Sequence, residues 1–465
     1  MEQVKCIVYK LRQLTYVLLG GIIFLQMSSC RNFLSIDPPR DQIISNEVFK
    51  DEVSATAALT GIYSRMMEEK QGFASGGIRS VTYLTSLSAD ELTEVTPGEF
   101  YRNQLLPING IINGYLWSEP YQYIYSANTI IAQLKYSLIN ESVKKQLIAE
   151  AKFVRSFCYF YLINLFGDVP LYLTADYRLN RLVSRTSKDI VYEQIIKDLI
   201  DVQSELSDQF SPKGRIRPGK WAATALLARC YLYVENWSEA DNHASTIISR
   251  SDLFSIPKDL DAVFLSSSPE AIWQLYPRSI GENTYEAGTF IIPTVPGNSV
   301  LSSSLLNSFE QYDLRRIHWI NHVHSDAGLF YYPFKYKITS RSSSDEYSVI
   351  FRLAEQYLIR SEARAHLNRI KDAQADLNVI RGRAGLDNIT ASDQASLLGA
   401  IELERQKELF TEWGHRWLDL KRTNRVDQVL KSIKSPNWQK EDALYPIPMD
   451  EISRNKNIKQ NNGYK

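Results

Sequence analysis

The sequence predicts a mostly α-helical protein built from tetratricopeptide-like helical repeats, with long irregular loops and a few short strands. Apolar residues recur at steps of three or four over much of the chain, which is the spacing of one helix face. Residues 220–249 and 347–384 look alike as pairs of helices joined by a short turn, and such pairs stack into superhelices. Two other long stretches lack this periodicity and are expected to be loops.

The pattern divides the chain into a leader, a tether and one large domain. Residues 1–29 are the expected signal peptide, residues 30–46 the tether and residues 47–465 the domain. Unstructured stretches as long as those in the domain are uncommon in compact proteins unless they are functional. The expected helical repeats lie at about 47–70, 117–250 and 347–422, and the expected ligand-binding, loop-rich insertions at about 71–116 and 251–346.

Composition excludes one class of partner. The formal net charge is zero, with 44% apolar and 23% charged residues, as in ordinary globular proteins. Nucleic acid binding needs a basic surface, so we expect no nucleic acid partner. The 27 tyrosines fit either a large core or an aromatic-lined binding surface.

The N-terminus is expected to be a lipoprotein signal peptide. Three basic residues precede an apolar run at residues 14–27, which is shorter than the ~20 residues of a membrane-spanning helix. Two serines then precede Cys30, the arrangement that a lipoprotein signal peptidase recognises. We therefore expect Cys30 to be the lipid-modified N-terminus, although Met27 stands where leucine is usual.

Apolar stripes place the first helices of the domain. Residues 47–69 and 117–138 each carry one apolar face. The strongest signal is at residues 150–166, where almost the whole circumference is apolar, so this helix must be buried on several sides. Gly167 and Pro170 end it. We expect it to form the core.

Later elements complete the prediction. Residues 187–206 and 394–412 are expected to be helices, the first with Ile190 facing the core, and the tail after Arg422 is expected to be mostly irregular. The strands expected in the second insertion are residues 271–275 and 331–338.

Small residues support close packing within the two hairpins. Ala228 and Ala240 in the first pair, and Ser361 and Ala373 in the second, would let the helices approach closely. Two unrelated hairpins are the alternative to a repeat. The cysteines in predicted helices, expected to be buried small hydrophobes because no spacing rule pairs them, are Cys158 and Cys230.

Few patterns point to catalysis or to a metal. Residues 214–221 approach a phosphate-binding loop, but Trp221 stands where Ser or Thr should hold Mg²⁺, and no strand precedes. Residues 318–324 hold three histidines, and His318 and His322 would share a helix face as zinc ligands can. Loop histidines that only form hydrogen bonds are commoner. We expect no catalytic residue, metal or cofactor.

The charged residues near the C-terminus are expected to form a structural ion-pair network. Arg405 with Glu408, and Asp419 with Arg416 and Arg422, lie at helical pairing distances. Two acidic pairs elsewhere could in principle hydrolyse glycosidic bonds, but no motif singles them out. These acidic pairs are Asp90-Glu91 and Asp345-Glu346, for which the sequence pattern alone indicates no charged partner.

Aromatic residues in the two insertions are the best candidates for a ligand site. Their rings can stack on a sugar ring or a peptide side chain, while neighbouring Arg and Asn bond hydroxyls or carbonyls. For any single residue, the alternative is that it fills the core beneath the loops. The expected ligand-binding residues are Phe100, Tyr101, Arg102, Asn103, Tyr285, Trp319 and Tyr331.

Four segments carry a family resemblance. Residues 30–39 read C-R-N-F-L-S-I-D-P-P, and L-F-G-D-V-P-L-Y follows the aromatic helix at residues 165–172. Residues 415–422 read H-R-W-L-D-L-K-R, and the chain closes with L-Y-P-I-P and N-N-G-Y. Together they resemble the SusD/RagB family of outer-membrane nutrient-binding lipoproteins of Bacteroidetes.

The resemblance implies a SusD-like surface lipoprotein that binds a nutrient, more often an oligosaccharide than a peptide, for polysaccharide utilisation. It also implies delivery to a SusC-like TonB-dependent transporter in the outer membrane, attachment through an N-terminal lipid, and no enzymatic activity. Two alternatives stay open: a secreted glycan-processing enzyme, and a helical-repeat scaffold that binds other proteins.

Overall fold

The computed structural model describes Val8 and residues 48–464, apart from 69–71, 211–213, 280 and 341–342. The chain divides into two compact units, Met1–Val48 and Phe49–Lys465. The predicted lipidation site Cys30 and the tether lie outside the described residues. None of the described helices combines the length and the apolar character needed to cross a membrane.

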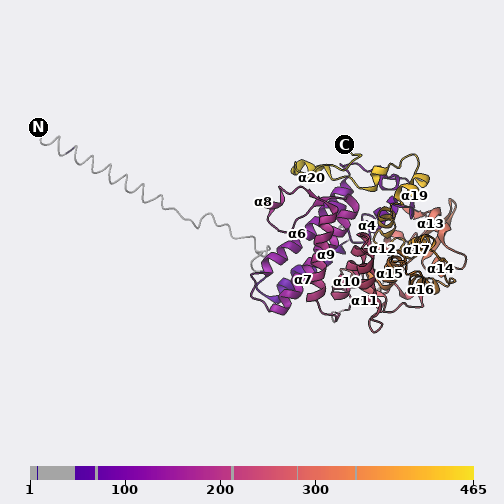
Figure 1. Ribbon diagram of the computed structural model, residues 1–465. Helices are drawn as coiled ribbons and strands as arrows, with labels where there is room; N and C mark the ends of the chain where they lie inside the picture. The colour runs from indigo at the N-terminus through magenta and orange to yellow at the C-terminus, as the bar shows by residue number, and fades with distance from the viewer. Residues whose placement is uncertain are drawn as a thin grey trace. The chain divides into compact units, whose positions relative to one another are not determined.

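Helices dominate the second unit (Figure 1). The longer helices are α3 (Glu52–Met66), α6 (Glu119–Leu134), α7 (Glu141–Phe166), α9 (Lys188–Glu205), α10 (Lys220–Tyr233), α11 (Trp237–Ile248), α15 (Leu353–His366), α16 (Ile370–Arg383) and α17 (Gln394–Leu409). The shorter ones are α4 (Val81–Ser88), α5 (Glu99–Arg102), the π-helix η2 (Ile112–Ser118), α8 (Tyr177–Asn180), η3 (Leu260–Ala262), α12 (Tyr285–Phe290), α13 (Ser303–Ser308), α14 (Leu314–His318), α18 (His415–Arg422), α19 (Val426–Ile433), η4 (Lys440–Ala443) and α20 (Met449–Arg454). The predicted mostly helical fold class is confirmed.

The long helices pack in succession, as helical repeats do. α6 lies against α7, α7 against α9, α9 against α10, and α10 against α11. α11 then packs on α15, and α15 on α16 and α17, so the two predicted hairpins are neighbours in space. Ala228, Ala240 and Ala373 are fully buried, and the hydroxyl of Ser361 donates to the carbonyl of Ala373 at 2.7 Å. The tetratricopeptide-like repeat is therefore present.

α7 forms the centre of the core, as predicted. Phe153 and Phe157 are fully buried and meet the ring of Trp273 edge-on, with centroids 5.0 and 5.4 Å apart, a favourable arrangement of aromatic rings. The helix ends at Gly167, whose φ of 75° lies in the left-handed region that favours glycine. Cys158 and Cys230 are both buried, as predicted, and both are free thiols.

The described strands pair two by two, all antiparallel: β1 (Leu92–Glu94) with β5 (Ser299–Leu301), β2 (Val169–Pro170) with β3 (Arg185–Thr186), β4 (Ala271–Leu275) with β8 (Ser348–Arg352), and β6 (Ile320–Ser325) with β7 (Gly328–Pro333). β4 is the strand predicted at residues 271–275. β7 begins three residues before the predicted strand at 331–338. β4 and β8 are buried along their whole length, so they belong to the core.

The C-terminal segment closes the end of α7. The backbone N–H of Tyr445 donates to the carbonyl of Leu165 at 2.9 Å. The side-chain amide of Asn461 donates to the carbonyls of Phe166 and Tyr445 at 2.9 and 2.8 Å. The bonds to Leu165 and Phe166 satisfy carbonyls that the last turn of a helix leaves unpaired. The tail after Arg422 is mostly irregular, as predicted, although the short helices α19 and α20 lie in it (Figure 1).

Three further expectations differ from the structure. Residues 72–116 are not one loop, because α4, β1, α5 and most of η2 lie there. Residues 348–352 form β8 and not the start of a helix. Ile190 on α9 is 52% exposed, and its neighbour Val191 faces the core instead, beside Ile195; the prediction for this helix face is wrong at that one position.

Candidate functional site

The two loop-rich segments meet at the strand pair β1–β5. The ladder continues beyond β1, where the backbone N–H of Val95 donates to the carbonyl of Asn298 at 3.0 Å. β5 in turn packs beside β7, and the rings of Tyr83 and Phe290 lie 6.0 Å apart. We call the surface of α5, β1, β5 and the hairpin β6–β7 the loop face. Segments some 200 residues apart in sequence are thus joined at one place.

Buried acidic residues hold the turn between α4 and β1 in place. Asp90 accepts two hydrogen bonds from Arg416, at 2.7 and 2.9 Å, and Glu91 accepts the hydroxyl of Ser86 at 2.7 Å. The backbone N–H of Ser302 donates to the carbonyl of Glu91 at 2.9 Å. Burial raises the pKa of Glu91 to about 7. This acidic pair, weighed above as hydrolytic, is buried and serves to anchor the loop.

The segment predicted at residues 100–103 divides into two supporting and two accessible side chains. Phe100 is buried and packs edge-on against Tyr445 at 5.7 Å. Asn103 is also buried. Its side-chain amide donates a hydrogen bond to the carbonyl of Ser88, and its side-chain oxygen accepts one from the ammonium of Lys434 at 2.9 Å. Both residues were predicted to contact a ligand at the surface, and the structure buries both in structural positions instead. Tyr101 is half-buried and Arg102 is exposed.

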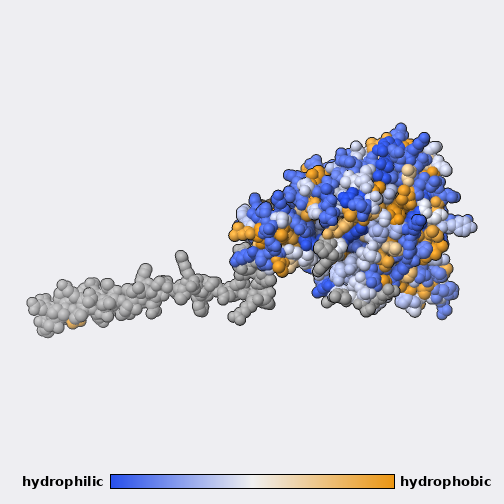
Figure 2. Space-filling model, turned by 90° about the horizontal axis from the view of Figure 1, so that it is seen from below, coloured by the Kyte–Doolittle hydropathy of each residue, from blue (hydrophilic) through white to orange (hydrophobic). Residues whose placement is uncertain are grey.

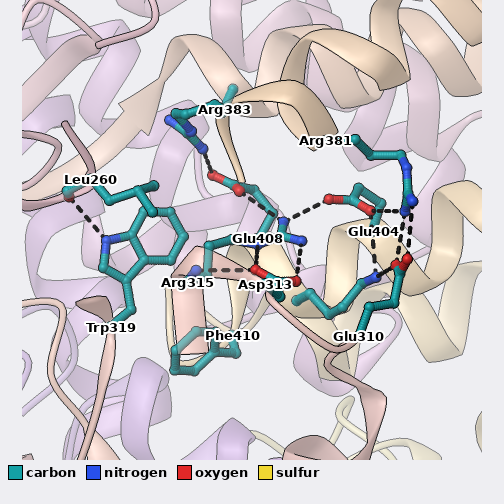
Figure 3. Close-up of polar contacts among 12 residues, drawn as sticks. Leu260, Glu310, Asp313, Arg315, Trp319, Arg381, Arg383, Glu404, Glu408 and Phe410 are labelled. Atoms are coloured by element: carbon teal, nitrogen blue, oxygen red, sulfur yellow. Dashed lines mark hydrogen bonds and ion pairs between the residues drawn. The ribbon is translucent and has the colours of Figure 1, made fainter. Parts of the chain in front are cut away.

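Trp319 is the clearest correction among the predicted ligand residues. Its side chain is fully buried, and the indole N–H donates to the carbonyl of Leu260 at 3.0 Å (Figure 3). The ammonium of Lys335 lies 4.9 Å from its ring centre. Trp319 therefore anchors the second insertion from within, and a ligand cannot reach its ring.

The hairpin β6–β7 presents the predicted Tyr331 beside a histidine. Tyr331 pairs with His322 across the two strands, and their ring centres lie 5.7 Å apart. His324 pairs with Leu329 in the same register, so these four side chains lie on one face of the hairpin. Tyr331 is half-buried, and the other three are exposed. The predicted Tyr285, at the start of α12, is half-buried as well.

Sequence reasoning missed part of this surface. Val95 and Val295, which both lie beyond the end of the β1–β5 pair where Glu94 faces Ser299, are 53% and 58% exposed, and Leu329 is 48% exposed. The alternation of exposure along β6 follows the period of two of a strand. A strand pattern in residues 320–325 was the available signal.

The three clustered histidines do not converge on a metal. His318 ends α14, whereas His322 and His324 lie on β6. His318 and His322 therefore do not share the helix face that the predicted zinc site would need. His318 Nδ1 lies 3.0 Å from a carboxylate oxygen of Asp261, and Lys337 also pairs with that oxygen. Because Asp261 already has a cationic partner, we assign no metal to this group.

The predicted ion-pair network exists and is buried (Figure 3). Arg315, with no exposed side-chain surface, pairs with Asp313 at 2.8 Å, Glu404 at 2.6 Å and Glu408 at 3.1 Å. Arg383 pairs with Glu408 as well. These bonds fasten the second insertion, which contributes Asp313 and Arg315, to α16 and α17 of the helical part.

The pairing inside the network differs from the prediction. Arg405 holds Asp419 at 2.8 Å and not Glu408, and Arg416 holds Asp90 at 2.7 Å and not Asp419. Arg422 holds Asp419 at 2.7 Å, as expected. Burial alone would raise the pKa of Glu408, but the surrounding guanidinium groups hold that pKa well below its usual range. Glu408 is therefore held in the network as an anion.

Two sequence models match separate parts of the chain. The model described as SusD family matches residues 319–464, and the model described as "Starch-binding associating with outer membrane" matches residues 33–232. Together they cover most of the chain, including β6, β7 and most of the first loop-rich segment.

Named relatives extend over nearly the full length. SusD-like protein P25 of Formosa agariphila is 26% identical, over 94% of this chain and 97% of its own. Starch-binding protein SusD of Bacteroides thetaiotaomicron is 23% identical, over 68% of this chain and 72% of its own.

Solved structures share the fold. A SusD superfamily protein from Bacteroides vulgatus superimposes with a TM-score of 0.80 at 21% identity, covering 90% of this chain and all of that one. A laminarin-binding SusD-like protein gives a TM-score of 0.74 at 23% identity, with the same coverage. The sequence matches, the long relatives and the shared fold agree: the chain belongs to the SusD family.

Proposed function

We propose that this protein is a cell-surface lipoprotein that binds a nutrient glycan and delivers it to a SusC-like TonB-dependent transporter of the outer membrane. Family membership supports the class of function, and the names of relatives refer to starch and laminarin. The observation that carries the proposal is the β1–β5 pair, which joins the two loop-rich segments that hold the predicted aromatic side chains.

The loop face offers the chemistry of glycan capture. Tyr101, Tyr285 and Tyr331 present half-buried rings, which can stack on the flat apolar side of a sugar at little cost in conformational entropy. Arg102 is exposed next to Tyr101 and can donate hydrogen bonds to sugar hydroxyls. Phe100, Asn103 and Trp319 support this surface from below. The rings stay in position because the residues beneath them are packed.

A binding screen tests the glycan proposal. The full chain would be tested against starch-derived and laminarin-derived oligosaccharides on an array and then by calorimetry. Tyr101→Ala and Tyr331→Ala should each weaken binding of a glycan found in this way by about 1–3 kcal/mol if the ring is an anchor. Tyr136→Ala is the matched control, because Tyr136 is 81% exposed and lies between α6 and α7. Equal affinities in all four proteins would refute this placement of the site.

The membrane attachment rests on Cys30. Its position after Ser28-Ser29 and an apolar run supports lipidation by the lipoprotein pathway. Cys30→Ala should move the protein from the membrane fraction to the soluble fraction with its circular dichroism spectrum unchanged. Retention of the variant in the membrane at the wild-type level would exclude lipid anchoring through this residue.

Delivery to a transporter requires a stable complex. Gentle detergent extraction followed by affinity purification should recover a large outer-membrane barrel protein together with this chain. Recovery of the free chain alone under conditions that preserve other outer-membrane complexes would argue for the scaffold or enzyme alternatives. The enzyme alternative is disfavoured by the burial of Asp90 and Glu91, which are 2% and 1% exposed.

A further inference from the structure

A polar hollow lies among the helices, outside both loop-rich segments. It has a volume of about 490 Å³. Its walls come from the turn between α10 and α11, the end of α15, one side of α17 and the end of α18. None of the residues that line it belongs to α5, β1, β5 or the hairpin β6–β7. It is therefore separate from the loop face.

The walls of this hollow carry three arginines and four carboxylates, and each arginine is paired. Arg405 pairs with Asp419 at 2.8 Å, Arg422 with Glu362 through two bonds of 2.5 and 2.8 Å, and Arg425 with Glu402 at 3.0 Å. Each guanidinium thus faces a carboxylate. A ligand with a full charge of either sign would meet a like charge at short range, so the hollow favours an uncharged molecule.

Three buried polar atoms, each in a side chain that lines the hollow, have no hydrogen-bond partner within the part of the chain that the structure describes. They are Nη1 of Arg405, the hydroxyl of Tyr233 and Nε of Arg425. The Arg405 side chain is only 2% exposed. Buried polar groups are nearly always bonded, and an unbonded one needs an explanation such as a missing ligand or water. Here three such groups, all able to donate, belong to side chains that line one hollow.

The hollow also has a flat aromatic wall and open space beside a helix. Trp237 and His366 are stacked with ring centres 3.8 Å apart and planes within 8°, and both residues line the hollow. Gly399 in α17 lines it too, and a Cβ added there would meet nothing within 4 Å. Flat rings surrounded by hydrogen-bond donors suit the mixed apolar and hydroxyl surface of a sugar.

We propose that this hollow is a second binding site, for an uncharged, hydroxyl-rich molecule of one or two sugar rings, with Arg405, Tyr233 and Arg425 as hydrogen-bond donors. Small shifts of these side chains would bring their unpaired atoms to sugar hydroxyls. The site does not depend on the loop face, so the two can be tested apart.

Saturation-transfer NMR on the full chain, in a sugar-free detergent, tests the site with glucose, maltose and laminaribiose as probes. Gly399→Leu fills the hollow and should weaken binding of the responding sugar at least tenfold. Gly61→Leu is the matched control, because Gly61 also lies in a helix, α3, with nothing within 4 Å of an added Cβ. The affinity of the Gly61→Leu variant for the responding sugar should equal that of the wild type.

Two more variants separate the explanations. Tyr233→Phe removes only the unpaired hydroxyl, so it should weaken binding about threefold to tenfold and leave the melting temperature unchanged or higher. The double variant Tyr101→Ala/Tyr331→Ala should leave the Gly399-dependent binding intact. The proposal is overturned if no probe gives a signal, if only the loop-face double variant loses binding, or if acetate binds as well as the sugars. A crystal structure with sugar in the loop face and only water beside Arg405 would also overturn it.

Discussion

Two regions of the molecule bury glutamates in opposite ways. In the C-terminal network, Glu408 is wholly buried among Arg315, Arg352 and Arg383, and its pKa is lowered despite burial. In the loop-rich segments, Glu286 is 3% exposed and has no arginine partner among the residues that the structure describes, and burial raises its pKa to about 7. The comparison shows that a buried, ionised glutamate stabilises one region, where arginines surround it, and destabilises the other, where none of the described arginines does.

The surroundings of Glu286 explain its state. Ser348 donates a hydroxyl hydrogen bond to Oε1 at 2.8 Å, whereas Oε2 has no partner among the described residues. Gly76 passes directly beside the carboxyl group. In Glu408, by contrast, ion pairs to three arginines offset the cost of desolvation.

The two regions should therefore respond to pH with opposite signs. Glu286 and Glu91, whose pKa values rise from 4.5 to about 7 on folding, contribute stability below about pH 4.5 that is lost as the pH rises through about 7. Glu408 and Asp419, whose pKa values are lowered, contribute stability above their ordinary pKa that is lost as the pH falls.

Neutralising the network should have the largest effect. Glu408→Gln removes the shared anion and leaves buried guanidinium groups uncompensated, so the free energy of unfolding should fall by about 3–5 kcal/mol at pH 7. Urea unfolding measures this. Glu141→Gln is the control, because Glu141 forms an exposed pair with Lys144 and should change stability by less than about 0.5 kcal/mol. Equal losses in the two variants would remove the distinction between buried and exposed pairs.

Neutralising Glu286 should have the opposite sign. Glu286→Gln should raise the free energy of unfolding at pH 8 by about 3 kcal/mol, because the folded state no longer holds an ionised carboxylate without a cation. At pH 4.5 the difference from the wild type should be small. Urea unfolding at both pH values tests this. A variant that is no more stable than the wild type at pH 8 would contradict the raised pKa.

Crowding Glu286 should have the smallest effect of the three. Gly76→Ala places a Cβ against the carboxyl group at a φ of +81°, which should cost about 1–3 kcal/mol. Gly61→Ala in α3, where a Cβ meets nothing, should instead add about 0.5–1 kcal/mol because alanine favours the helix. Melting temperatures that shift in the same direction for both would show that the close approach is unimportant.

The helical part was predictable because its signals are local. The apolar circumference of residues 150–166 and the small residues Ala228 and Ala240 are periodic features that a single helix reveals. The ion-pair network was foreseen from charge spacing. Its main partners, Arg315 and Arg352, were not, because they come from distant segments that only the fold brings to α17.

The loop face was predictable as a location but not in its details. Long aperiodic segments indicated function, and β1–β5 does join them. Whether a ring lies under or above the surface depends on long-range packing. Trp319, directly before β6, is buried beneath Lys335, while Tyr331 on β7 remains accessible. Sequence alone does not distinguish these two environments.

The hydrogen bonds from the tail to the end of α7 set a requirement on the timing of folding. Asn461 and Phe166 are 295 positions apart, so the most apolar helix of the domain is synthesised long before the residues that complete its last turn. Until then its end is open to water and to other chains. A truncation before Leu444 should therefore yield aggregates rather than a smaller soluble domain, which gel filtration would show. A chaperone that shields apolar segments would be needed for more than half of the period of synthesis.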